Sequence, residues 1–334
     1  MSGKDATIQK SLTVGAGGLI GIPRPLEQLS ESEIERKSCI SKVMTHTLKN
    51  LTSKFTDSGF QWLLPVALSR CTDPLWPDPG ASIDKQVEFE IYGKTVRTTA
   101  SMIMHKLIAS SLAYPKLFIL SPNIRIEKAD RACTGLHVYE FTQLDFEARN
   151  ATSKDIISLT DDVLCGLITS LRREMHDELV SLGRYDTLKV PKKPFKIYDR
   201  QELETKYGAD WERHLFDKNK DPVWVTNIPR EFYDFEDFET GKWDNYDLFL
   251  PKYGEVLSGA KREWEYTKII KKIKRDQINK ENYELPLSLA KQGKLKPCAG
   301  AGIGMERLVA WITGAKHVGE TQPFPKIPGK VYEL

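Results

Sequence analysis

The first long pattern in the chain is a stripe of apolar residues at helical spacing that begins after Ser30 and ends near Gly59. The segment 30–33, in which each of two serines is followed by a glutamate, is typical of a helix start, because these side chains cap exposed backbone N–H groups. The pattern therefore predicts a long amphipathic helix whose apolar face packs on another layer. That face consists of Ile34, Ile40, Val43, Met44, Leu48, Leu51 and Phe55.

The following segments alternate between strand and helix patterns. The apolar run 60–68 predicts an edge strand, because it contains Pro65, which cannot donate a backbone hydrogen bond. Alternating residues around Tyr92-Gly93 predict a hairpin, and helical spacing returns after Ser101 and over 155–182. Further strands are predicted near 224 and within 247–263. We therefore expect an α+β fold, with an extended arm at 1–29, one domain at 30–334 and a small insertion at about 186–222.

Glycine occupies alternate positions in the stretch Ala-Gly-Ala-Gly-Ile-Gly at 299–304. This predicts a strand that lacks side chains on one face, so that a ligand lies against its backbone. Helical spacing follows until Gly314, which is placed to end the helix. Arg307 then lies in the first helical turn, where the helix dipole disfavours a cation, so an anionic ligand is the better explanation of Arg307. Helix-strand packing is the alternative explanation of the glycines.

Polar residues recur on two other predicted hairpins. The strands 121–127 and 137–147 alternate polar and apolar residues, and a polar row inside a sheet is unfavourable unless it serves a site. Asp247 and Glu255 lie on two strands joined by a turn, which brings their carboxylates close together. Close carboxylates repel unless a cation or proton lies between them, and hard oxygen ligands suit Mg²⁺. Surface exposure of both acids is the alternative.

Composition limits the class of protein only loosely. The 334 residues are 40% hydrophobic, which permits a buried core, and 49 Lys and Arg against 46 Asp and Glu leave a net charge of +3. This balance does not indicate a nucleic-acid or membrane surface. The five cysteines show no Cys-x-x-Cys spacing, which favours reduced thiols over a zinc site. Without a membrane-length apolar run or an export signal, we expect a cytoplasmic protein.

Three segments together resemble the signature motifs of class II aminoacyl-tRNA synthetases. Gly-x-Gly-x-Gly-x-Glu-Arg-Leu at 300–308 resembles the third motif. Arg-x-Glu at 125–127, with His-x-x-Glu-Phe-Thr-x-Leu-Asp-x-Glu at 137–147, resembles the second. The helix, glycine, strand and proline of 31–68 are similar to the first, which forms the dimer interface in that family. The resemblance extends over 30–334 and implies a class II-like antiparallel sheet flanked by helices.

The resemblance also implies roles for individual residues. Arg125 and Arg307 would be the catalytic arginines, on the α- and γ-phosphates of ATP, and Mg²⁺ would be held by Asp247 and Glu255. The remaining ATP-binding residues would be Glu127, His137, Phe141 and Gly304. The substrate-binding residues would be Lys106 and Arg262 for a carboxylate, with Asp145 and Asp73 for an ammonium group; a simple turn role is the alternative for Asp73.

Segments at 62–65, 72–79, 121–125 and 227–233 resemble the archaeal-type asparagine synthetases that are related to asparaginyl-tRNA synthetase. The implied function is an AMP-forming ligase that activates aspartate with ATP and amidates it with ammonia. Because the arm at 1–29 is too short for an anticodon-binding domain, tRNA is expected to be an unlikely partner, and a homodimer through 31–68 is the expected assembly. The alternatives are an amide ligase that uses another amine and a tRNA-aminoacylating paralogue.

Overall fold

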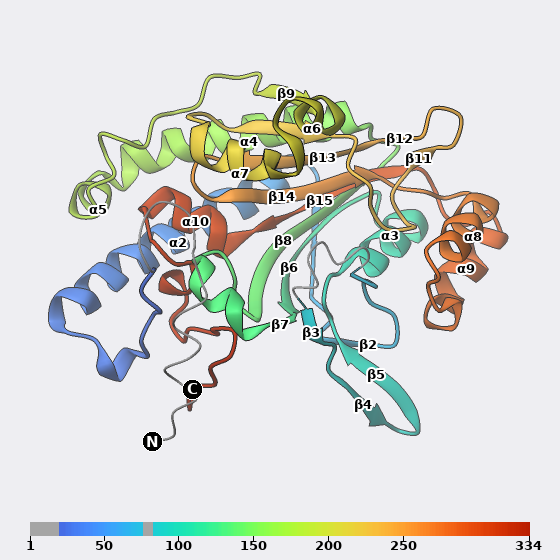
Figure 1. Cartoon of the computed structure of the whole chain (residues 1–334), viewed down its shortest axis with the longest axis horizontal. Coiled ribbons are helices and arrows are strands. Elements are labelled where there is room, and N and C mark those ends of the chain that lie inside the picture. Colours follow the sequence, from blue (N-terminus) through green and yellow to red (C-terminus); the bar gives the residue numbers. More distant parts are fainter. Residues whose placement is uncertain (1–19, 76–82) are drawn as a thin grey trace.

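The structure is a computed structural model that describes residues 20–75 and 83–334. Most of the arm predicted at 1–29, and part of the loop after Asp73, lie outside these residues. One eight-stranded sheet forms the centre of the molecule, with helices packed on it (Figure 1). Its strands, in spatial order, are β1 (Gln61–Leu63), β6 (Lys116–Ile124), β8 (Glu140–Arg149), β15 (Cys298–Gly304), β14 (Gly254–Lys261), β13 (Asn245–Leu250), β10 (Val223–Thr226) and β9 (Lys196–Asp199).

The six central strands of this sheet, from β6 to β10, pair antiparallel. At the two edges, β1 runs parallel to β6 and β9 runs parallel to β10. The expected α+β fold with an antiparallel sheet is confirmed, with a parallel strand added on each side. The smaller strands are β2 (Leu68–Ser69), β5 (Lys94–Thr98) and β4 (Glu88–Ile91) in one sheet, β3 (Ile83–Lys85) with β7 (Ile126–Glu127), and β11 (Glu236–Asp237) with β12 (Lys242–Trp243).

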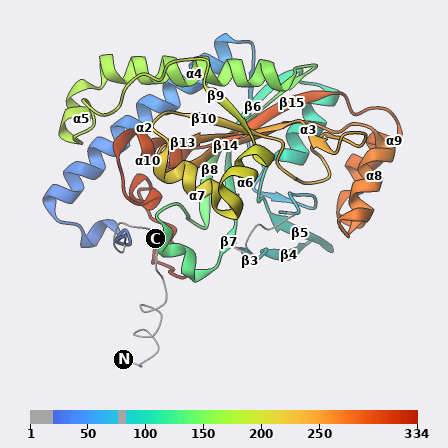
Figure 2. The same cartoon turned by 45° about the horizontal axis from the view of Figure 1, so that its top comes forward.

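The helices follow the predicted pattern. The first long one, α2 (Glu31–Asp57), begins with a capping box in which Ser30 and Glu33 satisfy each other's backbone N–H groups. It lies beside α4 in both views of the molecule (Figures 1 and 2). The others are α3 (Ile103–Leu112), α4 (Ser153–Glu174), α5 (His176–Ser181), α6 (Arg200–Tyr207), α7 (Trp211–Lys218), α8 (Tyr266–Arg275), α9 (Glu284–Lys291) and α10 (Met305–Thr313). None of the helices in the described residues is long and apolar enough to cross a membrane.

The side chains of β8 alternate between the two faces of the sheet, as a strand requires. Leu144 and Phe146 belong to the main hydrophobic core, together with apolar residues of α2 and α4. Asp145 and Glu147 contact Lys106 of α3 on the opposite face. The strand therefore joins a dry core on one side to a polar, buried region on the other, and that region is where the candidate site lies.

The alternating glycines of β15 form a strand, as predicted, but two of them have a different explanation from the expected ligand. A Cβ at Gly300 would lie 2.1 Å from the Phe146 carbonyl oxygen and 2.5 Å from the carboxylate of Glu147, and one at Gly302 would lie 2.9 Å from Asp145 Oδ1. The missing side chains thus leave room for the acids of the neighbouring strand. At Gly304 the nearest atom would be the Val256 carbonyl at 3.6 Å, so packing alone does not require glycine there.

The segment 186–222 contributes to the central sheet. Its strand β9 forms the edge beside β10, and its helices α6 and α7 follow. Trp211 of α7 packs against Phe249 of β13, with ring centroids 5.7 Å apart. The segment is therefore integrated with the central sheet.

The opposite edge of the sheet is exposed and apolar. On β1 and just after it, Trp62 is 55% exposed and Leu64 is 88% exposed. An edge strand with exposed apolar side chains is a surface that another chain can cover. The homodimer predicted from 31–68 would use it. We expect Leu64→Arg to dissociate that dimer in sedimentation velocity, whereas Val331→Arg, at a site 90% exposed, leaves the mass unchanged. A wild-type chain that sediments as a monomer would contradict the prediction.

Candidate active site

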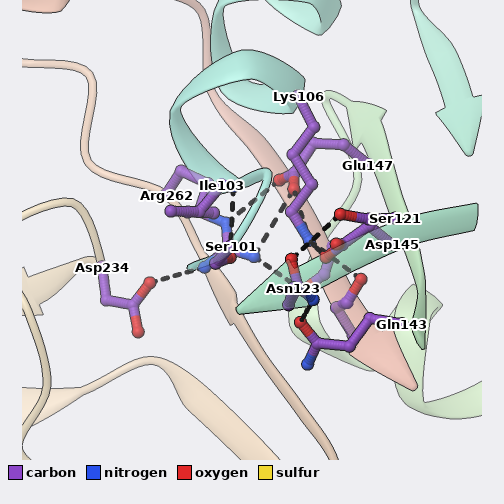
Figure 3. Close-up of polar contacts among 12 residues, drawn as sticks. Ser101, Ile103, Lys106, Ser121, Asn123, Gln143, Asp145, Glu147, Asp234 and Arg262 are labelled. Carbon is purple, nitrogen blue, oxygen red and sulfur yellow. Dashed lines mark hydrogen bonds and ion pairs between the residues drawn. The ribbon is translucent and has the colours of Figure 1, made fainter. Parts of the chain in front are cut away.

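Five buried charged residues form a cluster on the polar face of β8 and β15, which we call the buried charge cluster (Figure 3). They come from segments far apart in the sequence: α3, β8, the turn before β11, and the end of β14. Nothing in the sequence spacing requires these segments to meet; the sheet brings them together. The members are Lys106, Asp145, Glu147, Asp234 and Arg262.

Lys106 is only 2% exposed, and its charge is compensated inside the protein. Its Nζ donates to Asp145 Oδ1 at 2.8 Å and to the Ala301 carbonyl at 2.9 Å, and lies 3.8 Å from Glu147 Oε2. The predicted role for Lys106 was to bind a substrate carboxylate. In the structure two protein carboxylates already occupy its surroundings.

Arg262 is compensated in the same way. Its Nε donates to Glu147 Oε1 at 3.1 Å, Nη1 to Asp234 Oδ1 at 2.6 Å, and Nη2 to Glu147 Oε2 at 3.4 Å and the Gly300 carbonyl at 3.1 Å. Burial alone would lower the pKa of Arg262, but Glu147 and Asp234 outweigh it and hold this pKa well above its ordinary value. Four of the five N–H groups of this guanidinium thus have acceptors among the described residues, and one does not.

The buried charge cluster contains one more acid than bases and has an unused acceptor. Asp145 Oδ2 is buried and has no hydrogen-bond partner among the described residues. A buried carboxylate oxygen without a partner is costly, and a donor on a bound ligand would relieve the cost. Beside it, Ser121 donates to Asn123 at 3.0 Å and Asn123 donates to Gln143 Oε1 at 2.6 Å, which directs the Gln143 amide (Figure 3). This part of the site therefore suits a ligand that brings N–H donors.

Asp73 and Arg125 connect the buried charge cluster to a second group of residues, which contains Arg307. Burial raises the pKa of Asp73, and the charge of Arg125 opposes this shift. Arg125 Nε donates to the Ala100 carbonyl at 3.0 Å, and its guanidinium lies 5.2 Å from the centroid of the Phe141 ring. Asp73 also accepts from the Leu75 N–H at 2.8 Å, so the turn role proposed for it exists as well.

Arg307 and His137 lie together further along the site. Arg307 donates to the carbonyls of Glu255 and Leu136, the latter at 3.0 Å. Burial lowers the pKa of Arg307, and Glu255 and Glu127 oppose this shift. Burial and the neighbouring Arg307 lower the pKa of His137 to about 3, so its ring is neutral at physiological pH. Arg307 is thus held near acids without a direct ion pair to any residue that the structure describes, which leaves its charge available to an anion.

Asp247 and Glu255 come together as predicted, with Arg230 between them. Arg230 Nη2 contacts Asp247 Oδ2 and lies 3.7 Å from Glu255 Oε2. One arginine does not neutralise two acids; burial, with Glu255, raises the pKa of Asp247 to about 8 despite Arg230. Asp247 Oδ1 is buried without a hydrogen-bond partner among the described residues. No group of three or more His, Cys, Asp or Glu side chains suited to a metal occurs in the part of the chain that the structure describes.

The structure adds residues that the sequence did not assign. Glu147 lies within the second motif, yet only its register opposite Gly300 puts it beside Arg262. Asp234 and Arg230 come from the segment 230–234, where three charged residues next to two aromatic ones were the available signal. The sequence alone favours a solvated arginine at position 230 at least as strongly as an arginine that lines the site; in the structure Arg230 forms ion pairs with Asp247 and Glu255.

This arrangement matches a known family. Residues 84–328 match the family described as tRNA synthetases class II (D, K and N). The asparagine–tRNA ligase of Thermoplasma acidophilum is 29% identical over 86% of this chain and 68% of its own length. That of Thermococcus kodakarensis is 32% identical over 68% of this chain. The chain spans little more than half of several such relatives, 55% and 56% in the proteins of Mycoplasma mobile and Thermococcus kodakarensis.

A solved structure agrees in fold. The crystal structure of asparaginyl-tRNA synthetase from Pyrococcus horikoshii complexed with asparaginyl-adenylate aligns with a TM-score of 0.79 and 26% identity. The alignment covers 93% of this chain and 76% of that one.

These comparisons correct two predictions. The expectation of an asparagine synthetase that uses aspartate and ammonia is wrong, because the relatives are named as asparagine–tRNA ligases. The expectation that tRNA is an unlikely partner is wrong for the same reason. The first expectation depended on the resemblance of the segments 62–65, 72–79, 121–125 and 227–233, and the second on the short arm at 1–29. The structure also has Lys106 and Arg262 paired with protein acids.

Proposed function

Since the chain belongs to the class II tRNA synthetases of the D, K and N group, we propose that it activates asparagine with ATP and transfers the asparaginyl group to tRNA. The names of the relatives support asparagine and tRNA as substrates. The buried charge cluster provides an independent physical argument for the amino acid.

The observation that carries the proposal is that Arg262 is shared between Glu147 and Asp234. A carboxamide offers one acceptor oxygen and two N–H donors, so it needs a donor and an acceptor side by side. The remaining N–H of Arg262 and a carboxylate oxygen of Glu147 supply that pair. An aspartate side chain would instead bring a further negative charge into a cluster where acids already outnumber bases, which is costly in a buried site.

The other groups of the amino acid fit the same cluster. The α-ammonium group requires acceptors, and Asp145 Oδ2 and Asp73 provide carboxylates, the second of them near Arg125. This leaves the α-carboxylate directed toward the arginine. Lys106 then orients Asp145 and does not bind substrate itself, which revises its expected role.

The nucleotide side of the site provides cations for the reaction. The α-carboxylate oxygen attacks the α-phosphorus, the bond to the bridging oxygen breaks, and pyrophosphate leaves. Arg125 stabilises the charge that develops on the α-phosphate, and Arg307 holds the outer phosphates, since positioning and charge neutralisation supply most of the rate enhancement in such displacements. Phe141 offers a ring face to adenine, with Glu127, His137 and Gly304 around the nucleotide.

Mg²⁺ fits the pair of acids next to this region. Asp247 and Glu255 share one arginine, and Asp247 Oδ1 has no partner among the residues described, so this pair offers carboxylate oxygens to a divalent ion. When bound, it would neutralise charge on the phosphates. In the second reaction a ribose hydroxyl at the 3′ end of tRNA attacks the acyl carbon, and AMP leaves.

The raised pKa of Asp247 predicts that Mg²⁺ competes with a proton. Burial raises this pKa from 3.8 to about 8, so the folded chain holds the proton more tightly than the unfolded chain. Without Mg²⁺, this group's contribution to stability therefore declines as pH rises from about 4 to about 8. We expect thermal stabilisation by Mg²⁺ to be greater at pH 8 than at pH 6. In Asp247→Asn the difference should disappear; equal stabilisation of the wild type at both values would contradict the assignment.

The whole activity is tested by charging tRNA. The chain is incubated with ATP, Mg²⁺, bulk tRNA and labelled asparagine, and the acylated tRNA is separated on an acid gel. We expect labelled tRNA with asparagine and none with labelled aspartate. Label on tRNA from aspartate but not from asparagine would overturn the proposal.

A further inference from the structure

The helix α8 contains a lysine that is completely buried. In the basic segment 263–280, Lys271 and Lys274 are exposed, as lysines on a helix surface usually are. Lys272, however, is 0% exposed and lies on the same side as Ile269 and Ile273. A buried lysine is expensive unless its charge is paired, so its contacts indicate what it serves.

Lys272 contacts the segment that presents Asp234 to the site. Its Nζ donates to the backbone carbonyl of Asp234 and lies 3.5 Å from Glu263 Oε2. The backbone of Asp234 forms an isolated antiparallel β-bridge with that of Arg262. Beside this bridge, the N–H of Glu263 donates to the Tyr233 carbonyl at 2.8 Å. One ammonium group thus connects the segment that carries Asp234 to the segment that carries Arg262.

A second cation of α8 continues the same contact. Arg275, one helical turn after Lys272, donates to both carboxylate oxygens of Glu236 at 2.9 and 2.7 Å. Glu236 lies two residues after Asp234, on β11. Lys272 and Arg275, three positions apart on α8, thus contact Asp234 and Glu236, two positions apart in the neighbouring segment. The helix therefore fixes the segment 234–236 from outside the site.

We infer that Lys272 is a positioning residue for asparagine recognition, which acts through Asp234 on Arg262 and touches no substrate itself. This inference rests on the proposed function. Replacing a paired buried lysine by an apolar side chain is often neutral for stability when its acid partner is also neutralised. The stability of the fold therefore does not require the Lys272–Glu263 pair. The direction of the Arg262 guanidinium, in contrast, depends on the position of Asp234, which Lys272 holds through its backbone carbonyl.

The test separates positioning from charge balance. Lys272→Met alone leaves Glu263 as an uncompensated buried acid and is expected to destabilise the fold. In Lys272→Met/Glu263→Gln the charge balance is restored, so the thermal midpoint should return close to that of the wild type. We expect the KM for asparagine in ATP–pyrophosphate exchange to stay raised about tenfold in this double variant, with the KM for ATP unchanged within twofold, because a displaced binding group weakens only what it contacts.

Two further variants make the readout specific. Lys274→Met removes a charge from the exposed face of the same helix and should leave both KM values at the wild-type level. Asp234→Asn weakens the hold on Arg262 directly, and its effect on the asparagine KM should not add to that of the double variant, because both act through one contact.

A wild-type asparagine KM in the folded double variant would overturn the inference, and so would equal increases in the KM values for asparagine and ATP. If the proposed function is wrong, the wild-type chain itself shows no asparagine-dependent exchange. In that case the amino acid that does support exchange is used, and the ratio of variant to wild-type KM still tests Lys272.

Discussion

Arg307→Gln is expected to lower kcat/KM for ATP in asparagine-dependent pyrophosphate exchange by about a thousandfold, the order found when a single charged group on transferred phosphates is removed. Arg307 is fixed by the carbonyls of Glu255 and Leu136 and has no direct ion pair within the described part of the chain. We propose that its charge acts on the outer phosphates of ATP. Glutamine keeps hydrogen-bonding capacity but removes that charge.

Arg184 provides a matched control for this prediction. It too donates to two backbone carbonyls, those of Ile312 and Trp311, at the opposite end of α10. Arg184→Gln should therefore affect the helix in a similar way without changing exchange by more than about twofold. If both variants lose activity equally, Arg307 serves the packing of α10 and its assignment to ATP is wrong.

Glu147→Gln is expected to reduce the preference for asparagine over aspartate by about a hundredfold, because buried polar pairs reject ligands that leave them mismatched. Glu147 is the acid that Arg262 contacts through both Nε and Nη2. With glutamine in its place, the buried charge cluster no longer contains an excess of acids, and a substrate carboxylate meets a more positive site. The measurement is the ratio of kcat/KM for the two amino acids in exchange.

The control for Glu147 is a buried acid on the other side of the sheet. Asp161 of α4 accepts hydrogen bonds from Trp224 Nε1 at 2.9 Å and from the Phe195 N–H at 3.0 Å. Asp161→Asn should leave the ratio for the two amino acids unchanged. An unaltered ratio in Glu147→Gln would show that Glu147 does not select the side chain of the substrate.

Much of the fold was predictable because its signals are local. The capping box at Ser30, the apolar stripe of α2 and the stop at Gly314 depend on residues a few positions apart. The hairpin of β13 and β14 depends on one short turn, and it brought Asp247 and Glu255 together as expected. The residues that we assign to the nucleotide come from the second and third motifs, where the resemblance is most specific.

The contacts that decide the substrate were not predictable in this way. Glu147 meets Arg262 across a separation of 115 residues, and Lys106 meets Asp145 across 39. A lysine and an arginine near a site suggest an acidic substrate when they are read singly. Once the register of β8, β15 and β14 pairs them with protein acids, the same two residues favour a neutral amide.

The glycines of β15 and the lysine of α8 illustrate the same point. Gly300 and Gly302 were expected to expose backbone to a ligand, yet they make room for Glu147 and Asp145. Lys272 was indistinguishable from its exposed neighbours by residue type, and only the packing of α8 on the segment 234–236 reveals its contact.

The central claim is that the buried charge cluster selects asparagine for adenylation. The most direct measurement is ATP–pyrophosphate exchange by the wild-type chain with asparagine and aspartate in parallel, each at the same concentration and without tRNA or ammonia. We expect exchange with asparagine and none above background with aspartate. Exchange that depends on aspartate and is absent with asparagine would overturn the role assigned to the buried charge cluster.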